Sequence, residues 1–237
     1  MKNVVIIGDS LACPRPWIGL GQRGTYASLL QQAAGDRVHV ISLAGGERST
    51  RYYATGSFEK NYIEDSDTDT LIVQLGIVDC APRLMTFFER GIGFMCRKSR
   101  PANALFLKYV ATKSRYRLFF TKHFPNIMVK LPEFERNILN ILCKYVTKGG
   151  AKTVIFINIA YPGPHLTERS FEVLKIISNY NDVLDRTAQT DPDRIKVIDL
   201  FSITRDAPHL ITPEDGHHIT KAAHKILADR ILSMDRF

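Results

Sequence analysis

Five short runs of apolar and β-branched residues, spread along a chain of 237 residues, limit the possible folds more than any other feature. The runs lie at 3–7, 38–42, 70–75, 153–158 and 196–199. Short runs of this kind are typical of strands that are buried on both faces of a parallel sheet. Parallel strands need crossover connections, which helices supply. We therefore predict a three-layer, flavodoxin-like α/β fold with a five-stranded parallel sheet and helices on both faces.

Segments with helical character alternate with these runs. We predict helices at 25–34, 132–147, 168–189 and 220–233, and glycines follow the first two, as they follow many helices. The chain contains 45% hydrophobic and 24% charged residues, which is typical of a globular protein. At this length, residues 1–237 are expected to form a single domain. No apolar run approaches the ~20 residues that a membrane-spanning helix needs.

The cysteines and the N-terminal run indicate a compartment. Cys13, Cys80, Cys96 and Cys143 have neither the paired spacing of a metal site nor the density of a disulfide scaffold. The apolar run near the N-terminus is too short for the core of a signal peptide. We therefore expect a cytoplasmic protein, and no metal or other cofactor is predicted.

Two polar motifs stand at opposite ends of the chain. Gly8-Asp9-Ser10 follows the first apolar run, and Asp215-Gly216-His217-His218 precedes the last predicted helix. In doubly wound sheets, ligands bind beyond the carboxyl ends of the strands, where Ser10 is predicted to lie. A serine, a histidine and an acid together make an activated hydroxyl nucleophile. We predict a serine hydrolase in which Ser10 attacks an acyl carbonyl, a histidine of the second motif transfers the proton and Asp215 orients that histidine.

The sequence leaves alternatives open at this site. His217 could act as the base in place of His218, although with a different geometry toward the acid. His224, in the last predicted helix, fits a surface or packing position better. The residue types of Gly8-Asp9-Ser10 are also common in ordinary turns. The preceding strand and the distant acid-histidine motif favour the hydrolase.

These motifs resemble those of the SGNH hydrolase superfamily, also called GDSL-type esterases and acylhydrolases. Gly8-Asp9-Ser10-Leu11 matches its first block, Ala44-Gly45-Gly46 its glycine block, and Asp215-x-x-His218 its last block. The resemblance covers about residues 3–80 and 150–232. It implies a Ser10–His218–Asp215 triad and an oxyanion hole formed by the backbone N–H groups of Ser10 and Gly45, with Gly46 as the alternative to Gly45.

In one block the chain departs from this family. The family's Gly-x-Asn-Asp reads Gly76-Ile77-Val78-Asp79 here, so a valine stands where the resemblance implies an asparagine that donates to the oxyanion. Loss of one such donor costs ~2.7 to 4 kcal/mol of transition-state stabilisation. Without a replacement, the enzyme is predicted to be slow or inactive. The candidates for a replacement donor or a substrate contact are Arg83, Asn158, a protonated Asp79, and Arg15.

The segment at about 82–132 is strongly basic and rich in aromatic residues. It holds eleven lysines and arginines against one acid, a net charge of +10, whereas the whole chain has +8. Because it follows the third predicted strand, we predict a helical insertion that forms a lid or a substrate platform over the active site. Its charge favours anionic ligands such as acidic glycans, phosphorylated carriers or lipid headgroups at the inner membrane surface. A solvated helical subdomain is the alternative, and no motif favours nucleic acid.

A second glycine motif has a different explanation. Gly19-x-Gly21-x-x-Gly24 matches a dinucleotide-binding pattern, but it does not follow directly on a strand, and the next predicted strand lacks the acid that would bind a ribose. We interpret it as a loop that brings Arg15, Trp17 and Arg23 near Ser10.

The resemblance implies a serine esterase that removes an acyl group, most simply acetyl, from a carbohydrate or another small alcohol. Two further functions remain open. The same site could transfer the acyl group to an alcohol, or the chain could be a catalytically weak binding protein for anionic glycans or membrane surfaces. Val78 is the reason to consider a binding protein, and the intact set of Ser10, Asp215 and His218 argues against it.

Overall fold

The sheet is the one that the sequence predicts. The computed structural model describes residues 1–55 and 67–234. In this part of the chain, five parallel strands form one sheet in the order β2-β1-β3-β4-β5. The bounds of the strands are β1 Lys2–Gly8, β2 Val38–Ser42, β3 Thr68–Gln74, β4 Thr153–Ile157 and β5 Ile195–Ile198, so every predicted run is confirmed.

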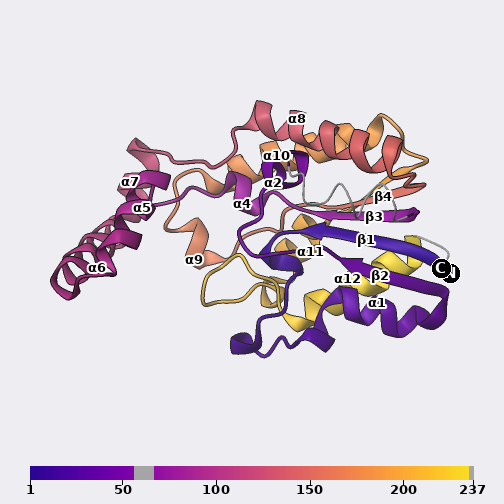
Figure 1. Cartoon of the computed structure of the whole chain (residues 1–237), viewed down its shortest axis with the longest axis horizontal. Helices are drawn as coiled ribbons and strands as arrows, with labels where there is room; N and C mark the ends of the chain where they lie inside the picture. Colours follow the sequence, from indigo (N-terminus) through magenta and orange to yellow (C-terminus); the bar gives the residue numbers. More distant parts are fainter. Residues whose placement is uncertain (56–66, 235–237) are drawn as a thin grey trace.

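Burial on both faces explains why these runs lack polar alternation. The inner strands β1, β3 and β4 are almost entirely buried, whereas the edge strand β2 is more exposed. Helices α1 (Tyr26–Ala34) and α12 (Lys221–Met234) cover one face of the sheet (Figure 1). Helices α2 (Thr50–Thr55), α8 (Leu131–Leu142) and α10 (Val173–Gln189) cover the other. The predicted three-layer fold is therefore confirmed.

A buried histidine joins the two helices on the first face. His224 of α12 is fully buried, and its Nδ1 accepts the N–H of Tyr26, the first residue of α1, at 3.2 Å. The two rings are stacked with centroids 5.6 Å apart. Burial lowers the pKa of His224 to about 4, so the ring is neutral at pH 7. His224 is thus a packing residue, one of the two positions that the sequence suggested.

Two predicted helices have different bounds. The segment predicted as a helix at 168–189 contains a break, because Glu172 adopts a left-handed conformation with φ of 50°, and α10 begins only at Val173. A separate short helix, α9, spans Pro164–Thr167. The helix predicted at 132–147 ends as α8 at Leu142 and continues as a π-helical turn. Helices α4 (Ile77–Cys80) and α11 (Leu200–Asp206) follow β3 and β5 directly and are too short to show a sequence period.

The predicted basic insertion forms three helices that project from the carboxyl-terminal edge of the sheet (Figure 1). They are α5 (Phe87–Cys96), α6 (Arg100–Arg115) and α7 (Arg117–His123), and we call residues 87–123 the arm. Thr86 and Glu89 form a capping box at the start of α5, and Glu89 also accepts a hydrogen bond from Lys113 of α6 at 2.7 Å. These contacts join α5 to α6.

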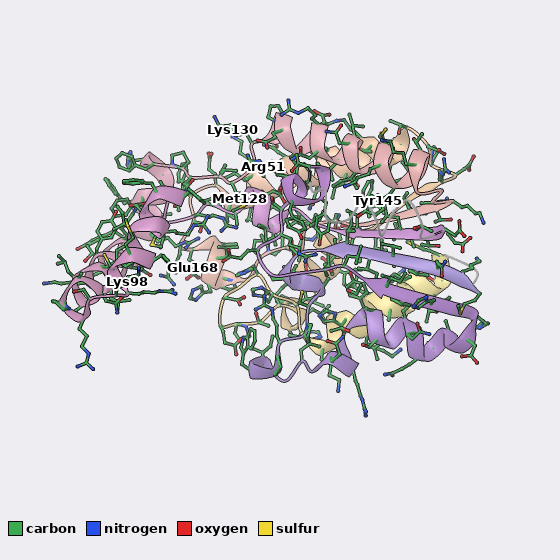
Figure 2. The ribbon with its side chains drawn as sticks, in the orientation of Figure 1. Arg51, Lys98, Met128, Lys130, Tyr145 and Glu168 are labelled. Carbon is green, nitrogen blue, oxygen red and sulfur yellow. The ribbon has the colours of Figure 1, made fainter. Side chains whose placement is uncertain are left out.

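The arm carries many exposed side chains (Figure 2). Several large apolar residues of the arm are more than half exposed, including Phe87, Phe88, Phe94, Met95, Leu105 and Leu107. Helices of sufficient length and apolar character to cross a membrane are not found among residues 1–55 and 67–234. The arm is thus a basic and apolar surface outside the body of the sheet.

Candidate active site

Ser10 lies on a tight turn at the carboxyl end of β1. A Cβ atom at Gly8 would come within 2.9 Å of the Cβ of Ala12, so only glycine allows the chain to fold back this closely. The Asp9 N–H donates to the Gln74 carbonyl of β3 at 3.1 Å, and the Asp9 carboxylate accepts the Leu11 N–H at 2.9 Å. These bonds begin a 3₁₀ turn whose first residue is Ser10. The motif therefore places the hydroxyl where ligands bind in such sheets.

The other motif brings its acid and its histidine to this hydroxyl. Ser10 Oγ lies 3.0 Å from His218 Nε2, and His218 Nδ1 lies 2.5 Å from Asp215 Oδ2. His218 is buried, although it contacts the pocket described below. The distances are those of a continuous hydrogen-bonded chain from carboxylate to hydroxyl.

The loop that carries Asp215 and His218 is fixed by its own backbone. Asp215 Oδ1 accepts the N–H groups of His217 and His218, each at 3.0 Å, and the Thr212 hydroxyl at 2.9 Å. Gly216 has φ of 72°, and a Cβ atom there would lie 2.8 Å from the N atom of Leu166. The loop therefore positions the acid before any ligand is bound.

Electrostatics distinguish the two adjacent histidines. Burial raises the pKa of Asp215, but hydrogen bonds from His218 and from the backbone outweigh this effect and hold its pKa well below the ordinary value. Burial, followed by the neighbouring His218, lowers the pKa of His217 to about 4. His217 Nδ1 lies 3.2 Å from the Asp215 carbonyl oxygen and 3.3 Å from its carboxylate Oδ1, but the nitrogen that contacts Ser10 Oγ belongs to His218. The structure thus places His218, and not its rival His217, between acid and hydroxyl.

The structure distinguishes the two glycines that the sequence offers for the oxyanion hole. The Gly45 N–H donates to the Gly8 carbonyl at 3.0 Å and is therefore already used. Gly46 lines the same pocket as Ser10. In the part of the chain that the structure describes, neither the Ser10 N–H nor the Gly46 N–H donates a hydrogen bond. The unused N–H and the place in the pocket favour Gly46 over Gly45 as the glycine donor.

Two of the candidate replacement donors do not reach the site. Asn158 follows β4, but its amide donates to Asp199 at 2.9 Å and its carbonyl accepts the Phe201 N–H, so it is satisfied outside the Ser10 pocket. Asp79 accepts the Thr50 N–H at 2.9 Å and the Thr50 hydroxyl at 2.6 Å. Asp79 therefore caps α2 instead of facing an oxyanion. The sequence could not reveal either partner.

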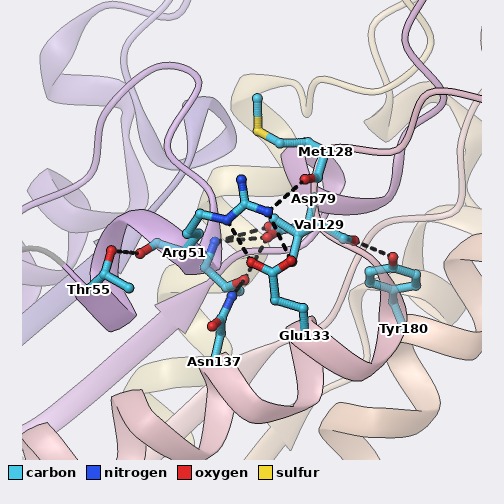
Figure 3. Close-up of polar contacts among 9 residues, drawn as sticks. Arg51, Thr55, Asp79, Met128, Val129, Glu133, Asn137 and Tyr180 are labelled. Carbon is cyan, nitrogen blue, oxygen red and sulfur yellow. Dashed lines mark hydrogen bonds and ion pairs between the residues drawn. The ribbon is translucent and has the colours of Figure 1, made fainter. Parts of the chain in front are cut away.

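The network around Asp79 also anchors the loop that carries Val78. Asn137 of α8 donates to the Thr50 hydroxyl at 3.1 Å, and the Asp79 carbonyl accepts the Val129 N–H at 3.2 Å. On the outer side, Arg51 of α2 contacts Glu133 of α8 with distances of 2.6 and 2.9 Å (Figure 3). Val78 therefore sits on a turn that is tied to α2 and α8.

A pocket of about 610 Å³ opens beside Ser10. Ser10, Gly46, Val78 and His218 form its inner wall, and residues of the predicted insertion segment, including Arg83 and Arg90, form the outer wall. The segment thus lines the mouth of the site. Arg15 also lines the pocket, whereas Trp17, which is 74% exposed, and Arg23 do not.

The triad loop also groups three potential metal ligands. Each of these residues, Asp215, His217 and His218, offers one ligand atom, and the three atoms lie within 4.8 Å of one another. His218, however, already uses Nδ1 toward Asp215 and Nε2 toward Ser10. The geometry therefore suits proton transfer better than metal binding.

Asp9 is a buried acid that the sequence did not single out. Burial raises the pKa of Asp9 from its ordinary 3.8 to about 7. Hydrogen bonds from the Leu11 and Val78 N–H groups lower this pKa but do not outweigh burial. A second buried acid, Asp79, adds a like charge that raises it further. The folded protein therefore binds a proton at Asp9 over a pH range in which the unfolded chain does not.

Replacement of Asp9 by asparagine is expected to change how stability depends on pH. Between about pH 4 and pH 7, folding takes up a proton at Asp9, so the contribution of Asp9 to the free energy of unfolding falls as pH rises, by about 1 kcal/mol per pH unit. Asparagine does not titrate and still has an oxygen for the Leu11 N–H. Urea unfolding of both proteins at several pH values gives the difference. Asp79 is present in both proteins and so does not produce the difference. If the difference between their free energies of unfolding stays constant between pH 4 and pH 7, the raised pKa of Asp9 is contradicted.

Tyr53 is another residue that sequence reasoning missed. It is fully buried, and its hydroxyl lies 2.8 Å from the Gly8 carbonyl and 2.7 Å from the Leu43 carbonyl. It thereby joins the nucleophile turn to the strand that leads to the glycine block. No sequence signal marks it, because it lies more than forty residues from Gly8.

The fold and the site together define a class: a three-layer protein with a serine, a histidine and an aspartate at the carboxyl edge of a parallel sheet. No protein-family model and no curated protein sequence matches the chain. Solved structures do. A lipase/acylhydrolase from Enterococcus faecalis has a TM-score of 0.63 and 14% identity, with 99% of this chain and 95% of that chain covered.

Two other solved structures give the same result. A member of the lipolytic G-D-S-L family from Veillonella parvula has a TM-score of 0.61 and 11% identity, with coverage of 100% and 99%. An acetylxylan esterase from Geobacillus stearothermophilus has a TM-score of 0.61 and 18% identity, with coverage of 98% and 93%. The chain therefore has the fold of the GDSL-type, or SGNH, hydrolases, and the resemblance read from the sequence is confirmed at the level of fold.

Proposed function

We propose that the protein is a serine esterase of the SGNH type. The observation that carries this proposal is the hydrogen-bonded chain from Asp215 through His218 to Ser10, with distances of 2.5 and 3.0 Å. Ser10 and His218, at the end of this hydrogen-bonded series, line a pocket that is large enough for a small ester. Nothing in a pure binding site requires a hydroxyl, an imidazole and a carboxylate in this order.

The geometry supports acyl transfer in two steps. Ser10 Oγ attacks the ester carbonyl while His218 Nε2 takes its proton, and Asp215 stabilises the resulting imidazolium. The oxyanion of the tetrahedral intermediate accepts the Ser10 and Gly46 N–H groups. When the intermediate collapses, the C–O bond to the alcohol breaks and His218 returns the proton to the leaving oxygen. Water then attacks the acyl-serine by the same route and releases the acid.

Acetyl esters of carbohydrates are the substrates that we propose. Acetylxylan esterases are among the solved structures with this fold, as are a lipase/acylhydrolase and an esterase, which supports this choice. The fold does not decide between hydrolysis and transfer, since an alcohol that enters the pocket can replace water in the second step. Contact of the arm with an anionic membrane surface stays a prediction that rests on its charge and exposed aromatic residues.

A covalent probe tests the proposal directly. An alkyl phosphonate that carries a leaving group is expected to label the wild-type protein once, at Ser10, as identified by mass spectrometry of peptides. Ser10→Ala is expected to remain unlabelled and to lose hydrolysis of aryl acetates. Ser233→Ala, which removes a hydroxyl at the far end of α12, serves as the matched control and should label like wild type. Absence of both labelling and turnover in the wild type would overturn the proposal.

A further inference from the structure

The pocket beside Ser10 has an unusual excess of positive charge. Four arginines line it, Arg15, Arg83, Arg90 and Arg117, and Glu47 is the one acid among its lining residues. The Glu47 carboxylate lies 3.6 Å from Arg90 Nη1, beyond hydrogen-bonding distance, and its side chain is 78% exposed. Glu47 therefore compensates little of the charge in the pocket.

Two of the four arginines have other roles in the structure. Arg117 donates from Nε to the Ser170 hydroxyl at 3.1 Å and from Nη2 to the Pro82 carbonyl at 2.8 Å, which fixes the junction between arm and body. Arg15 lies near the carboxylates of Asp215 and Asp9, which compensate its charge, although its buried Nε, like that of Arg90, has no hydrogen-bond partner among the described residues. Arg83 and Arg90 remain, and both come from the segment that forms the outer wall.

Arg83 and Arg90 share one acid, Glu47, whose side chain is largely exposed. Burial, followed by the positive charge of Arg90, lowers the pKa of Arg83, against Glu47 and Asp79, which raise it. Arg83 donates to the Val78 carbonyl at 3.2 Å. The buried Nε of Arg90 has no hydrogen-bond partner among the described residues. A buried donor without an acceptor and a pair of like charges are both unfavourable in the unliganded protein.

We propose that Arg83 and Arg90 bind an anionic group of the substrate, a carboxylate or a phosphate. Such a group accepts hydrogen bonds from both guanidinium groups and compensates the positive charge that the exposed Glu47 leaves in the pocket. This inference rests on the proposed esterase function. Because the acyl group proposed there is acetyl, which carries no charge, the anion belongs to the alcohol part. The substrate class is thus the acetyl esters of acidic sugars or sugar phosphates.

A pair of substrates that differ only in this charge tests the inference. The pair is an O-acetylated methyl glucuronoside and the corresponding O-acetylated methyl glucoside. The wild type is expected to hydrolyse the glucuronoside with a kcat/KM at least about tenfold higher, a preference that shrinks as salt is added. Arg90→Gln and Arg83→Gln should each reduce the ratio of the two kcat/KM values about tenfold.

A matched control separates this site from the general charge of the arm. Lys98 lies on the arm outside the pocket lining and is exposed (Figure 2). Lys98→Gln removes the same unit of charge from the same segment. It is expected to leave the substrate ratio within about twofold of wild type, because a solvent-exposed charge at a distance is largely screened. If Lys98→Gln reduces the ratio of the two kcat/KM values as much as Arg90→Gln does, the proposed site is overturned. The preference for the anionic substrate then comes from the general positive charge of the arm.

An equilibrium measurement keeps the test independent of turnover. Calorimetry with the deacetylated products, methyl glucuronoside and methyl glucoside, is expected to show about tenfold tighter binding of the acid by the wild type and no such preference in Arg90→Gln. Equal binding of both sugars, with hydrolysis of both esters at Ser10, overturns the anion site and leaves the esterase. Preferential binding of the acid without hydrolysis of any ester supports the anion site and rejects the esterase.

Discussion

Replacement of His218 by glutamine is expected to lower kcat for hydrolysis of an aryl acetate by about 10⁴-fold or more, whereas the same replacement at His217 lowers it by less than about tenfold. Only His218 lies between Asp215 and Ser10, with its two ring nitrogens 2.5 and 3.0 Å from their oxygens. Glutamine fills a similar volume but cannot take up the proton of the serine. The adjacent variant is a control for disturbance of the loop.

The kinetic pattern distinguishes a base from a residue that only shapes the pocket. Loss of His218 removes proton transfer, so kcat falls and labelling of Ser10 by the phosphonate slows in parallel. His217 lines the pocket, so its replacement acts mainly on KM. Urea unfolding of each variant establishes that it is folded. Equal loss of kcat in the two variants, or a larger loss for His217→Gln, contradicts the assignment of His218.

The parts of the structure that the sequence predicts are those set by local pattern. The five apolar runs became five strands because burial on both faces leaves no room for polar alternation, as in β1 and β4. Ser10 was placed at the carboxyl edge of the sheet because it follows the first predicted strand. His218 was chosen because Asp215-x-x-His218 resembles the last block of the SGNH hydrolases.

The choices that the sequence left open depend on hydrogen bonds between distant segments. Gly45 and Gly46 are indistinguishable in sequence, and what separates them is that the N–H of the first meets the Gly8 carbonyl at 3.0 Å. Asn158 lies at the predicted end of its strand, but a carboxylate on the next segment, Asp199, binds its amide. The break at Glu172 follows a backbone conformation that no residue pattern in this segment indicates. Such choices depend on tertiary contacts, which a single sequence does not contain.

Replacement of Val78 by asparagine is expected to raise kcat for aryl acetate hydrolysis about 100-fold. Val78 lines the pocket with Ser10, and its loop is anchored through Asp79 to Thr50, so the new side chain enters a fixed position. The amide would add a third donor to the N–H groups of Ser10 and Gly46. Because the oxyanion forms only in the transition state, the gain should appear in kcat and not in KM.

Leucine at the same position is the matched control for this gain. It has nearly the shape of asparagine but donates no hydrogen bond, so Val78→Leu is expected to show no increase in kcat. Steady-state kinetics of the two variants with one substrate give the comparison, and thermal unfolding measures any loss of stability. If asparagine is no faster than leucine, the absence of a donor at position 78 does not limit the wild type, and the prediction is contradicted. A gain confined to asparagine shows instead that Val78 limits an otherwise complete acyl-transfer site.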